Sequence, residues 1–206
     1  MKISIVPTLL AVLFFTGCGA TDSENPSDTP PVEAPPAAST ESEEMAEVDG
    51  KVGITPDNTR IEFVGTHAPG KTEPRKGEFN KFMGHVELED QTLKAIHVDI
   101  DTTSLKTEIE KLTNHLKSPD FFDVNEHPQA SFTSTAIQAD GEGKAQVTGD
   151  LTLLGKTESI QFPATYSTED GLKLSADFMI DRTKFGMDYG QDNVEKEVQI
   201  IISVGK

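Results

Sequence analysis

The sequence predicts an all-β domain in which eight short antiparallel strands form a barrel or a sandwich, with one short helix. Three observations support this fold class. Apolar and polar residues alternate along evenly spaced segments, turn-forming tripeptides separate several of these segments, and only one stretch of the domain has the period of a helix. Strands, turns and helix all fall in the last three quarters of the chain.

Residues 1–17 have the composition of a signal peptide and are excluded from the fold. Lys2 supplies a positive start, and the apolar run Ile3–Phe15 is too short to span a bilayer. Small residues then precede Cys18, and the run Phe15-Thr16-Gly17-Cys18 resembles a bacterial lipobox, with phenylalanine where leucine is commoner. An ordinary secretory signal that happens to contain a cysteine is the alternative.

Cys18 is the only cysteine, so it has no partner for a disulfide within the chain. If the lipobox is used, Cys18 becomes the acylated first residue and anchors the protein to a membrane. Gly19 follows in place of aspartate, which favours the outer membrane. The predicted location is therefore extracytoplasmic and lipid-anchored, at the outer membrane facing the periplasm.

Residues 18–51 are predicted to form an acidic, proline-rich tether. This segment holds five of the twelve prolines, nine acidic residues, one lysine and no aromatic residue. It cannot bury enough apolar surface to fold, and its composition favours an extended chain. Residues 52–206 are then one domain by length.

The formal net charge of the protein is −17, and no cluster of basic residues stands out. Such a surface argues against nucleic acid or an anionic lipid surface as the main partner.

Three strands are expected before the helix. Thr59–Thr66 alternates, with Ile61 and Phe63 on one face. Gly77–Glu89 changes its apolar spacing near Asn80-Lys81, which predicts a bulge or bend there. The third strand, Ala95–Leu105, alternates from Ile96 to Ile100.

The helix is expected within Glu108–Ser118, because Ile109, Leu112 and Leu116 recur at three- and four-residue spacing. Ser118-Pro119 ends it, since the residue before a proline is disfavoured in a helix and proline has no N–H. The period then changes to two, so the helix is predicted to form a lid on the strands.

Five strands follow the helix, separated by turns that contain glycine. The predicted strands are Ala130–Gln138, Gly143–Leu154, Ser159–Ser167, Leu172–Asp181 and Glu195–Val204. The turns are Ala139-Asp140-Gly141, Leu154-Gly155-Lys156 and Glu169-Asp170-Gly171.

The alternation gives one almost purely apolar inner face, and eight closed strands enclose an interior that either fills with side chains or holds one slim ligand. Alternation alone leaves both outcomes open. Small residues on this face, Gly149, Ala164 and Ala176, favour the ligand because they leave width. The predicted inner face consists of Ile61, Phe63, Val98, Ile100, Phe132, Val147, Leu151, Leu153, Ile160, Phe162, Phe178, Ile180, Ile200 and Ile202.

The sequence offers few signs of catalysis or metal binding. The five histidines form no pair at helical spacing and no cluster with the spacing of metal ligands. No nucleophile elbow and no glycine-rich phosphate loop is present. No catalytic residue and no metal ligand is therefore assigned, and the outward-facing strand acids are taken as solvated charge.

Residues 115–124 (HLKSPDFFDV), 147–155 (VTGDLTLLG) and 180–187 (IDRTKFGM) resemble three motifs of the YceI-like family, in the same order. The resemblance covers nearly all of the domain from Val52 onward. It implies an eight-stranded, lipocalin-like barrel that holds a polyisoprenoid or similar lipid in an apolar pore, and it brings no catalytic residue. A lipobox and tether before the domain depart from the family's usual soluble periplasmic form.

We therefore expect an apolar pore with a polar rim. The rim residues expected to meet an anionic or quinone head group are Arg182 first and His115 second, with a salt bridge from Arg182 to Asp181 or another strand acid as the alternative. The pore lining is predicted to include Phe63, Val98, Ile100, Phe121, Phe122, Phe132, Leu151, Phe162, Phe178, Ile180 and Ile200.

The predicted function is to bind and sequester or carry a polyisoprenoid or quinone-like lipid, on a membrane to which acylated Cys18 tethers the protein. Two alternatives remain open: an enzyme that acts on such a lipid or a redox partner, and a packed structural or stress lipoprotein without a ligand. No cofactor other than the bound lipid is expected, no nucleic acid is expected, and a homodimer is possible.

Overall fold

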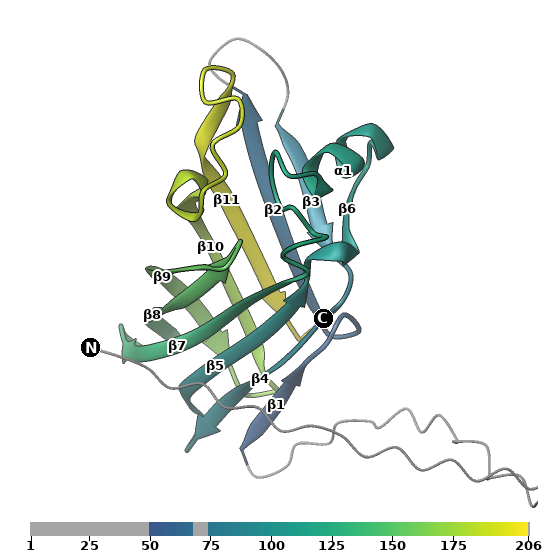
Figure 1. The fold of residues 1–206 in the computed structure, drawn as a ribbon. Helices are drawn as coiled ribbons and strands as arrows, with labels where there is room; N and C mark the ends of the chain where they lie inside the picture. Colours follow the sequence, from purple (N-terminus) through teal and green to yellow (C-terminus); the bar gives the residue numbers. More distant parts are fainter. Residues whose placement is uncertain (1–49, 68–73, 206) are drawn as a thin grey trace, which may run out of the picture. The chain divides into compact units, whose positions relative to one another are not determined.

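The computed structural model describes residues 50–67 and 74–205. The predicted signal peptide, Cys18 and all but the last two residues of the predicted tether lie outside these residues. The described part is a single antiparallel sheet of eleven strands that curls around an apolar interior (Figure 1). The order across the sheet is β1-β4-β5-β7-β8-β9-β10-β11-β2-β3-β6.

The first six strands precede the helix and include the two edges of the sheet. They are β1 (Lys51–Ile54), β2 (Thr59–His67), β3 (Arg75–Phe79), β4 (Phe82–Glu89), β5 (Thr92–Asp101) and β6 (Leu105–Thr107). The remaining strands follow helix α1 (Glu110–Lys117). They are β7 (Gln129–Ala139), β8 (Lys144–Leu153), β9 (Lys156–Ser167), β10 (Lys173–Asp181) and β11 (Val194–Val204).

The prediction of eight strands is wrong because two of the predicted strands are broken at a corner and one strand was missed. Gly77–Glu89 is divided at Asn80-Lys81, where a bend was expected, into β3 and β4. Ala95–Leu105 is divided by the short 3-10 helix Thr102–Ser104 into β5 and β6. The missed strand is β1, whose four residues hold only two large apolar side chains.

Hydrogen bonds hold this corner together. The hydroxyl of Ser104 accepts from the backbone N–H groups of Asn80 and Lys81 at 3.1 and 2.9 Å, so the two broken strands bend side by side. At the turn from β1 to β2, the side chain of Asn58 donates to the carbonyl of Gly53 at 2.8 Å. At such a corner a strand bends sharply and continues in a new direction, which lets the sheet curl around its concave face.

The sheet is a curled half-barrel, and the predicted closed barrel is therefore also wrong. Its edge strands are β1 and β6, which do not pair with each other within the described residues. The other features of the predicted fold class are present: the sheet is antiparallel throughout and there is one short α-helix.

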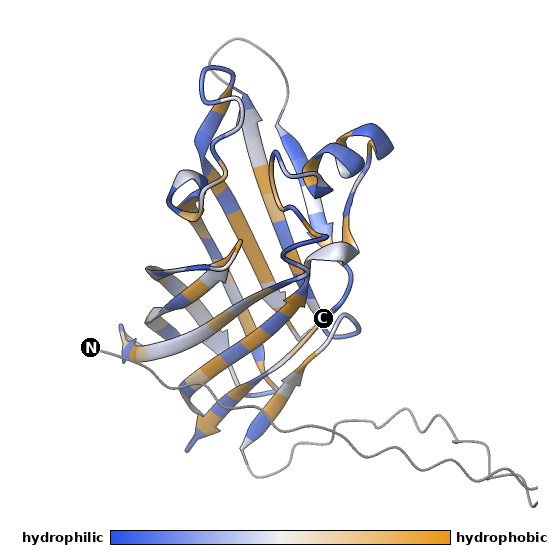
Figure 2. Ribbon diagram, in the orientation of Figure 1, coloured by the Kyte–Doolittle hydropathy of each residue, from blue (hydrophilic) through white to orange (hydrophobic). Residues whose placement is uncertain are grey.

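Side chains on the concave face are mostly apolar, and hydrophobic and hydrophilic residues alternate along the strands (Figure 2). Within β7, for example, Ala130 and Phe132 are buried while Gln129 and Thr133 are exposed. The predicted turn at Leu154-Gly155 is a two-residue hairpin in which both residues have positive φ, 50° and 70°. Such turns match the twist of the strands they join.

Helix α1 ends at Lys117 with Ser118 as its extended C-cap residue, as the following proline predicts. The hydroxyl of Ser118 donates to the carbonyl of His115 at 2.7 Å, and the N–H of Phe122 donates to the carbonyl of Leu116 at 3.0 Å. The chain after the helix is thus folded back onto it. Ile109, predicted on the apolar face, precedes the helix and is 43% exposed. Within residues 50–67 and 74–205, no helix has the length and apolar character needed to cross a membrane.

Candidate functional site

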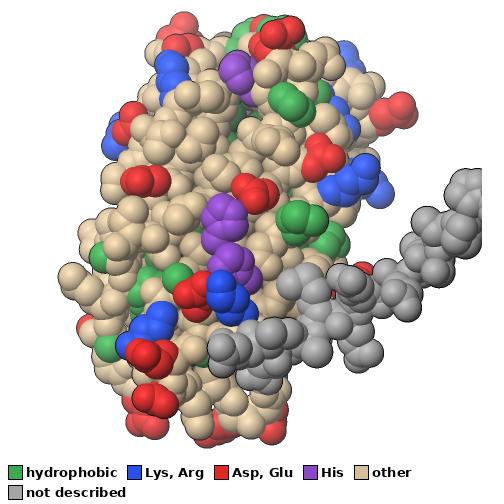
Figure 3. Space-filling view, turned by 60° about the horizontal axis from the view of Figure 1, so that its bottom comes forward, with side chains coloured by type: hydrophobic (Ala, Val, Ile, Leu, Met, Phe, Trp, Pro, Cys, Tyr) green, Lys and Arg blue, Asp and Glu red, His purple; other side chains and the backbone are tan. Residues whose placement is uncertain are grey.

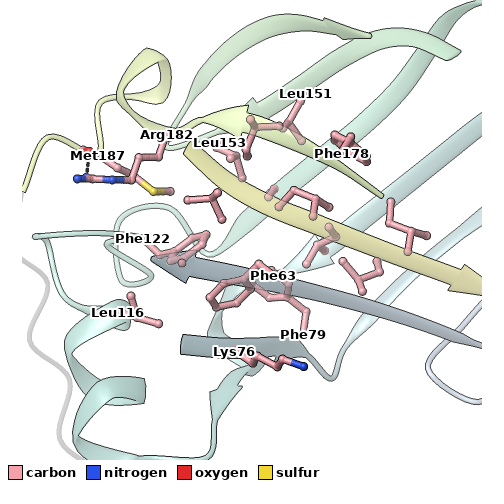
Figure 4. A pocket seen from close by; sticks show the side chains of 18 of the residues that line it. Phe63, Lys76, Phe79, Leu116, Phe122, Leu151, Leu153, Phe178, Arg182 and Met187 are labelled. Carbon is pink, nitrogen blue, oxygen red and sulfur yellow. Dashed lines mark hydrogen bonds between the residues drawn. The ribbon is translucent and has the colours of Figure 1, made fainter. Parts of the chain in front are cut away.

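The concave side of the sheet encloses an elongated cavity of about 460 Å³ (Figure 4). Apolar side chains from β2, β5, β7, β8, β9, β10 and β11 form most of its wall, and residues from α1 and the loop after it contribute at one end. The alternation left open whether the inner-face side chains fill the interior. The cavity shows that they do not.

All thirteen residues that the sequence assigned to the pore and its rim line this cavity. Whether they contact a lipid stays a prediction. From the wider inner face, Val147 is fully buried but does not border the cavity. Gly149 does not widen it either, because the ring of Phe132 occupies the space beside this glycine.

The floor of the cavity is its closed end, formed by Ile54, Thr59, Val86, Ile96, Leu174 and Val204. All six residues are buried, and Val86 has no exposed surface. They belong to, or adjoin, the large cluster of buried side chains that forms the main hydrophobic core. The floor is thus part of the close-packed interior.

The mouth is the opposite end, formed by Gly65, His67, Arg75, Leu112, His115 and Tyr189. Its side chains are half-buried or exposed, and Tyr189 has 47% of its surface exposed. Helix α1 and the connection from β10 to β11 both lie at this end of the sheet (Figure 1). The cavity therefore opens between elements that are far apart in the sequence.

Aromatic rings line the wall between floor and mouth. Phe162 and Phe178 are stacked with ring centroids 4.2 Å apart. Nearer the mouth, Phe122 contacts both Phe63 and Phe79, at centroid distances of 6.1 and 5.7 Å. Phe122 thereby joins the loop after α1 to the wall of the sheet. Aromatic pairs of this kind contribute stabilising free energy beyond that of the apolar area they bury.

At the mouth, His115 stands edge-on to two aromatic rings. Its ring centroid lies 5.1 Å from that of Phe121 and 5.1 Å from that of Tyr189. Its Nε2 and the Oδ2 of Asp120 are 3.0 Å apart. One nitrogen of this predicted rim residue is therefore already engaged within the protein.

Arg182 is 3% exposed, and its guanidinium group is bound by backbone carbonyls. It donates to the carbonyls of Glu195 and Val194 at 3.0 and 3.1 Å and to that of Met187 (Figure 4). Burial lowers the pKa of Arg182 from its ordinary value. The alternative reading of Arg182, a salt bridge to Asp181 or another strand acid, is not found among the described residues.

Asp181 instead caps the short 3-10 helix Arg182–Phe185. Its carboxylate accepts hydrogen bonds from the N–H and the hydroxyl of Thr183 at 3.0 and 2.6 Å. Both bonds lower the pKa of the carboxyl group, and the bond from the hydroxyl has the larger effect. Asp101 accepts from Thr103 in the same way at the β5–β6 corner, and its pKa is lowered for the same reason. Both carboxylates have structural partners.

A second group of titratable side chains lies on the outer face of β4 and β5. The rings of His85 and His97 are 5.8 Å apart, and the Nε2 of His97 is 3.0 Å from Asp99. Figure 3 shows neighbouring histidines on the surface amid charged side chains. Over the described ranges, no group of three or more histidine, cysteine or acidic residues is placed to hold a metal ion.

Sequence reasoning missed three residues of the mouth, Gly65, His67 and Arg75, whereas the loop that contains Tyr189 was expected there. The alternation of the first predicted strand was stopped at Thr66, and one more step places His67 on the inner face. The strand that contains Arg75 was started two residues late, at Gly77. The Nδ1 of His67 is buried without a hydrogen-bond partner among the described residues.

The comparisons with known proteins agree with this fold. The profile of the YceI-like domain matches residues 53–205. A UPF0312 protein of Pseudomonas putida (strain W619) is 41% identical over 95 residues, which are 45% of this chain and 50% of that protein. This chain thus spans about half the length of the curated relatives it matches. The chain belongs to the YceI-like domain family.

Two solved structures have a similar fold. BcnA of Burkholderia cenocepacia superposes with a TM-score of 0.66 at 26% identity, covering 73% of this chain and 98% of BcnA. A polyisoprenoid binding domain from Saccharophagus degradans, implicated in plant cell wall breakdown, superposes with a TM-score of 0.57. It is 12% identical, over 76% of this chain and 99% of that domain, and this similarity shows the fold alone.

Proposed function

We propose that this protein binds the apolar chain of a polyisoprenoid or quinone-like lipid in its half-barrel cavity and carries or sequesters it outside the cytoplasm, tethered to a membrane through Cys18. The observation that carries the proposal is the cavity of about 460 Å³, whose wall is apolar from floor to mouth. Membership of the YceI-like family and the ligand class named for the Saccharophagus degradans domain support it.

The chemistry of the wall suits such a ligand. A prenyl chain is slim, branched and apolar except at one end, and each methylene gains about 0.8 kcal/mol on leaving water. The cavity volume lies within the range of about 300–1,000 Å³ that is typical of small-molecule sites. The closed floor receives the tail, and the head group stays at the mouth.

Displacement of a fluorescent probe tests the proposal. The neutral fluorophore N-phenyl-1-naphthylamine is bound to the detergent-free protein and displaced with geranylgeraniol. We expect saturable displacement at one molecule per chain. Leu151→Trp, which adds bulk to the cavity wall, should abolish binding of both compounds.

Met179→Trp is the matched control, because Met179 is 54% exposed and does not border the cavity. It should bind like the wild type. Ile160→Phe is a second, smaller filling variant in case Leu151→Trp does not fold. The proposal is wrong if the wild-type protein binds neither compound, or if folded Leu151→Trp binds both as well as Met179→Trp does.

A further inference from the structure

The charged side chains that line the cavity are all basic. Arg75, Lys76 and Arg182 border it together with two histidines, and among the described lining residues there is no aspartate or glutamate. The whole sequence has 35 acidic residues and 18 lysines and arginines, so acids would be expected at the mouth by composition. The lining of the cavity therefore differs in charge from the protein as a whole.

Strand register places Arg75 on the inner face. Phe63 points into the cavity, and Gly65 lies two residues further along β2 on the same face. Arg75 is the direct cross-strand partner of Gly65, and residues paired in this way project from the same side of a sheet. Lys76 pairs with Val64 and, although it borders the cavity, it alternates with Arg75 and is exposed.

Arg75 is also available to a ligand, unlike Arg182. Within residues 50–67 and 74–205, no carboxylate lies within ion-pair distance of Arg75, and no hydrogen bond from its side chain is formed. Arg182 spends three of its N–H groups on backbone carbonyls. Of the two arginines at the cavity, only Arg75 has a free guanidinium group in the described structure.

There is space beside it. A Cβ atom added to Gly65 would meet no atom within 4 Å, so the site directly across from Arg75 is open. By contrast, the space beside Gly77 on β3 is taken by the ring of Phe63. The open site therefore lies at the outer end of the aromatic wall, where the polar end of a bound lipid would emerge.

We infer that Arg75 is the head-group residue of this cavity and that the preferred ligand is an amphiphile with an anionic oxygen head, either a phosphate or a carboxylate, on an apolar chain. The inference rests on the proposed function and assigns the chemistry of the ligand's polar end. It also moves the head-group site from Arg182 and His115, where the sequence placed it, to β3.

The physical basis is the geometry of the guanidinium group. Its N–H donors form paired hydrogen bonds to carboxylate and phosphate oxygens, and these charge-assisted bonds are stronger than neutral ones. Arg75 is half-buried at the mouth, so its charge is screened less than that of an exposed residue. A neutral alcohol on the same apolar chain offers Arg75 one oxygen and no charge, so it gains less binding free energy from the guanidinium group.

The test compares matched ligands in matched variants. Dissociation constants are measured by displacement of N-phenyl-1-naphthylamine at neutral pH for two pairs: geranylgeranyl monophosphate with geranylgeraniol, and hexadecanoate with hexadecanol. We expect Arg75→Gln to weaken binding of the anions about tenfold and binding of the alcohols less than about twofold. Gly65→Val, which fills the open site, should also weaken the anions selectively.

The control is Arg60→Gln, which removes the same charge from the exposed outer face of β2 and should leave every constant unchanged. The anion that binds more tightly to the wild type identifies the source as a phosphate or a carboxylate lipid. If Arg75→Gln and Arg60→Gln change the dissociation constants of the anions equally, the inference is wrong. The proposed function still stands in that case, provided that the wild type binds the alcohols. If the wild type binds no alcohol either, the proposed function fails as well.

Discussion

At the floor of the cavity, Val86 and Leu174 are buried among the side chains of the main core, whereas at the mouth Leu112 is half-buried and Tyr189 is 47% exposed. The floor is built by strands of the sheet, whereas helix α1 and the connection from β10 to β11 contribute to the mouth. One end of the cavity is therefore part of what stabilises the fold, and the other end is free to serve binding.

The comparison predicts that changes at the floor lower the free energy of unfolding, while changes at the mouth alter ligand affinity with little effect on stability. Arg182 is the exception, because it lines the cavity near the mouth but supports the structure there.

The largest loss of stability is expected for Arg182→Met. The methionine fills much of the volume but leaves three carbonyl groups, of Met187, Val194 and Glu195, without their donor. An unsatisfied buried polar group costs about 1–3 kcal/mol, and some of the three carbonyl groups will accept a hydrogen bond from water instead. We therefore expect Arg182→Met to lower the free energy of unfolding by about 3 kcal/mol. Urea denaturation measures it.

Lys184→Met is the control for this change, because Lys184 lies in the same 3-10 helix and is exposed. It should change the free energy of unfolding by less than about 0.5 kcal/mol. Equal stability of the two variants would show that the carbonyl contacts of Arg182 contribute nothing.

The second prediction sets floor against mouth directly. Val86→Ala removes fewer atoms than Leu112→Ala, yet Val86 is fully buried and Leu112 is only half-buried. We expect Val86→Ala to cost about 2 kcal/mol and Leu112→Ala less than about 1 kcal/mol, with weaker geranylgeraniol binding only in the latter. If the larger deletion at the mouth costs more stability, the distinction between the two ends is wrong.

Two glycines on the paired strands β2 and β3 provide the third prediction. In Gly77→Ala the new methyl group meets the ring of Phe63, which is itself packed against other rings, so we expect a loss of about 1–2 kcal/mol. In Gly65→Ala the methyl group enters open space, and the reduced freedom of the unfolded chain favours folding by up to about 1 kcal/mol. Thermal denaturation of both variants measures the difference, and a stabilised Gly77→Ala protein would contradict it.

The smallest effect concerns pH. The hydroxyl and N–H of Thr183 lower the pKa of Asp181 in the folded protein below its value of about 3.9 in the unfolded chain. The resulting stabilisation is complete above the unfolded pKa and is lost as the pH falls through the folded pKa. We expect Asp181→Asn to be less stable than the wild type by under about 1 kcal/mol at neutral pH, and equal to it in strong acid.

Asp150→Asn removes the same charge at an exposed position of β8 and serves as the comparison. Urea denaturation at a series of pH values gives both differences. A gap between Asp181→Asn and the wild type that stays constant down to strong acid would mean that this carboxylate makes no pH-dependent contribution.

Most of the strand segments could be predicted from the sequence, because alternation is a local signal. The same is true of the helix end at Ser118-Pro119, where proline acts on its own neighbour. Alternation also identified inward side chains: the nine predicted lining residues on strands all border the cavity, as do Phe121 and Phe122 from the loop after the helix.

Only half of the corner could be predicted. The change in apolar spacing marked the bend at Asn80-Lys81, but no glycine or proline marks the break at Thr102–Ser104, and the hydroxyl that stabilises the corner joins residues 23 and 24 positions apart. The openness of the sheet depends on whether its edges, β1 and β6, meet, and no local pattern encodes that.

The mouth was harder to predict than the wall. Arg182 contacts carbonyls 5 to 13 residues away in a loop whose path the sequence does not show. Arg75 precedes the part of β3 where alternation is visible, so its inward direction appears only from its pairing with Gly65.

The most direct test of the account is to identify what the cavity contains when the protein is isolated. Protein purified without detergent is extracted with organic solvent, and the extract is analysed by mass spectrometry beside that of folded Leu151→Trp. We expect an apolar-chain lipid, close to one per chain, in the wild-type extract and its loss from the variant. A wild-type extract without such a lipid, from a protein whose melting temperature geranylgeraniol does not raise, would contradict it.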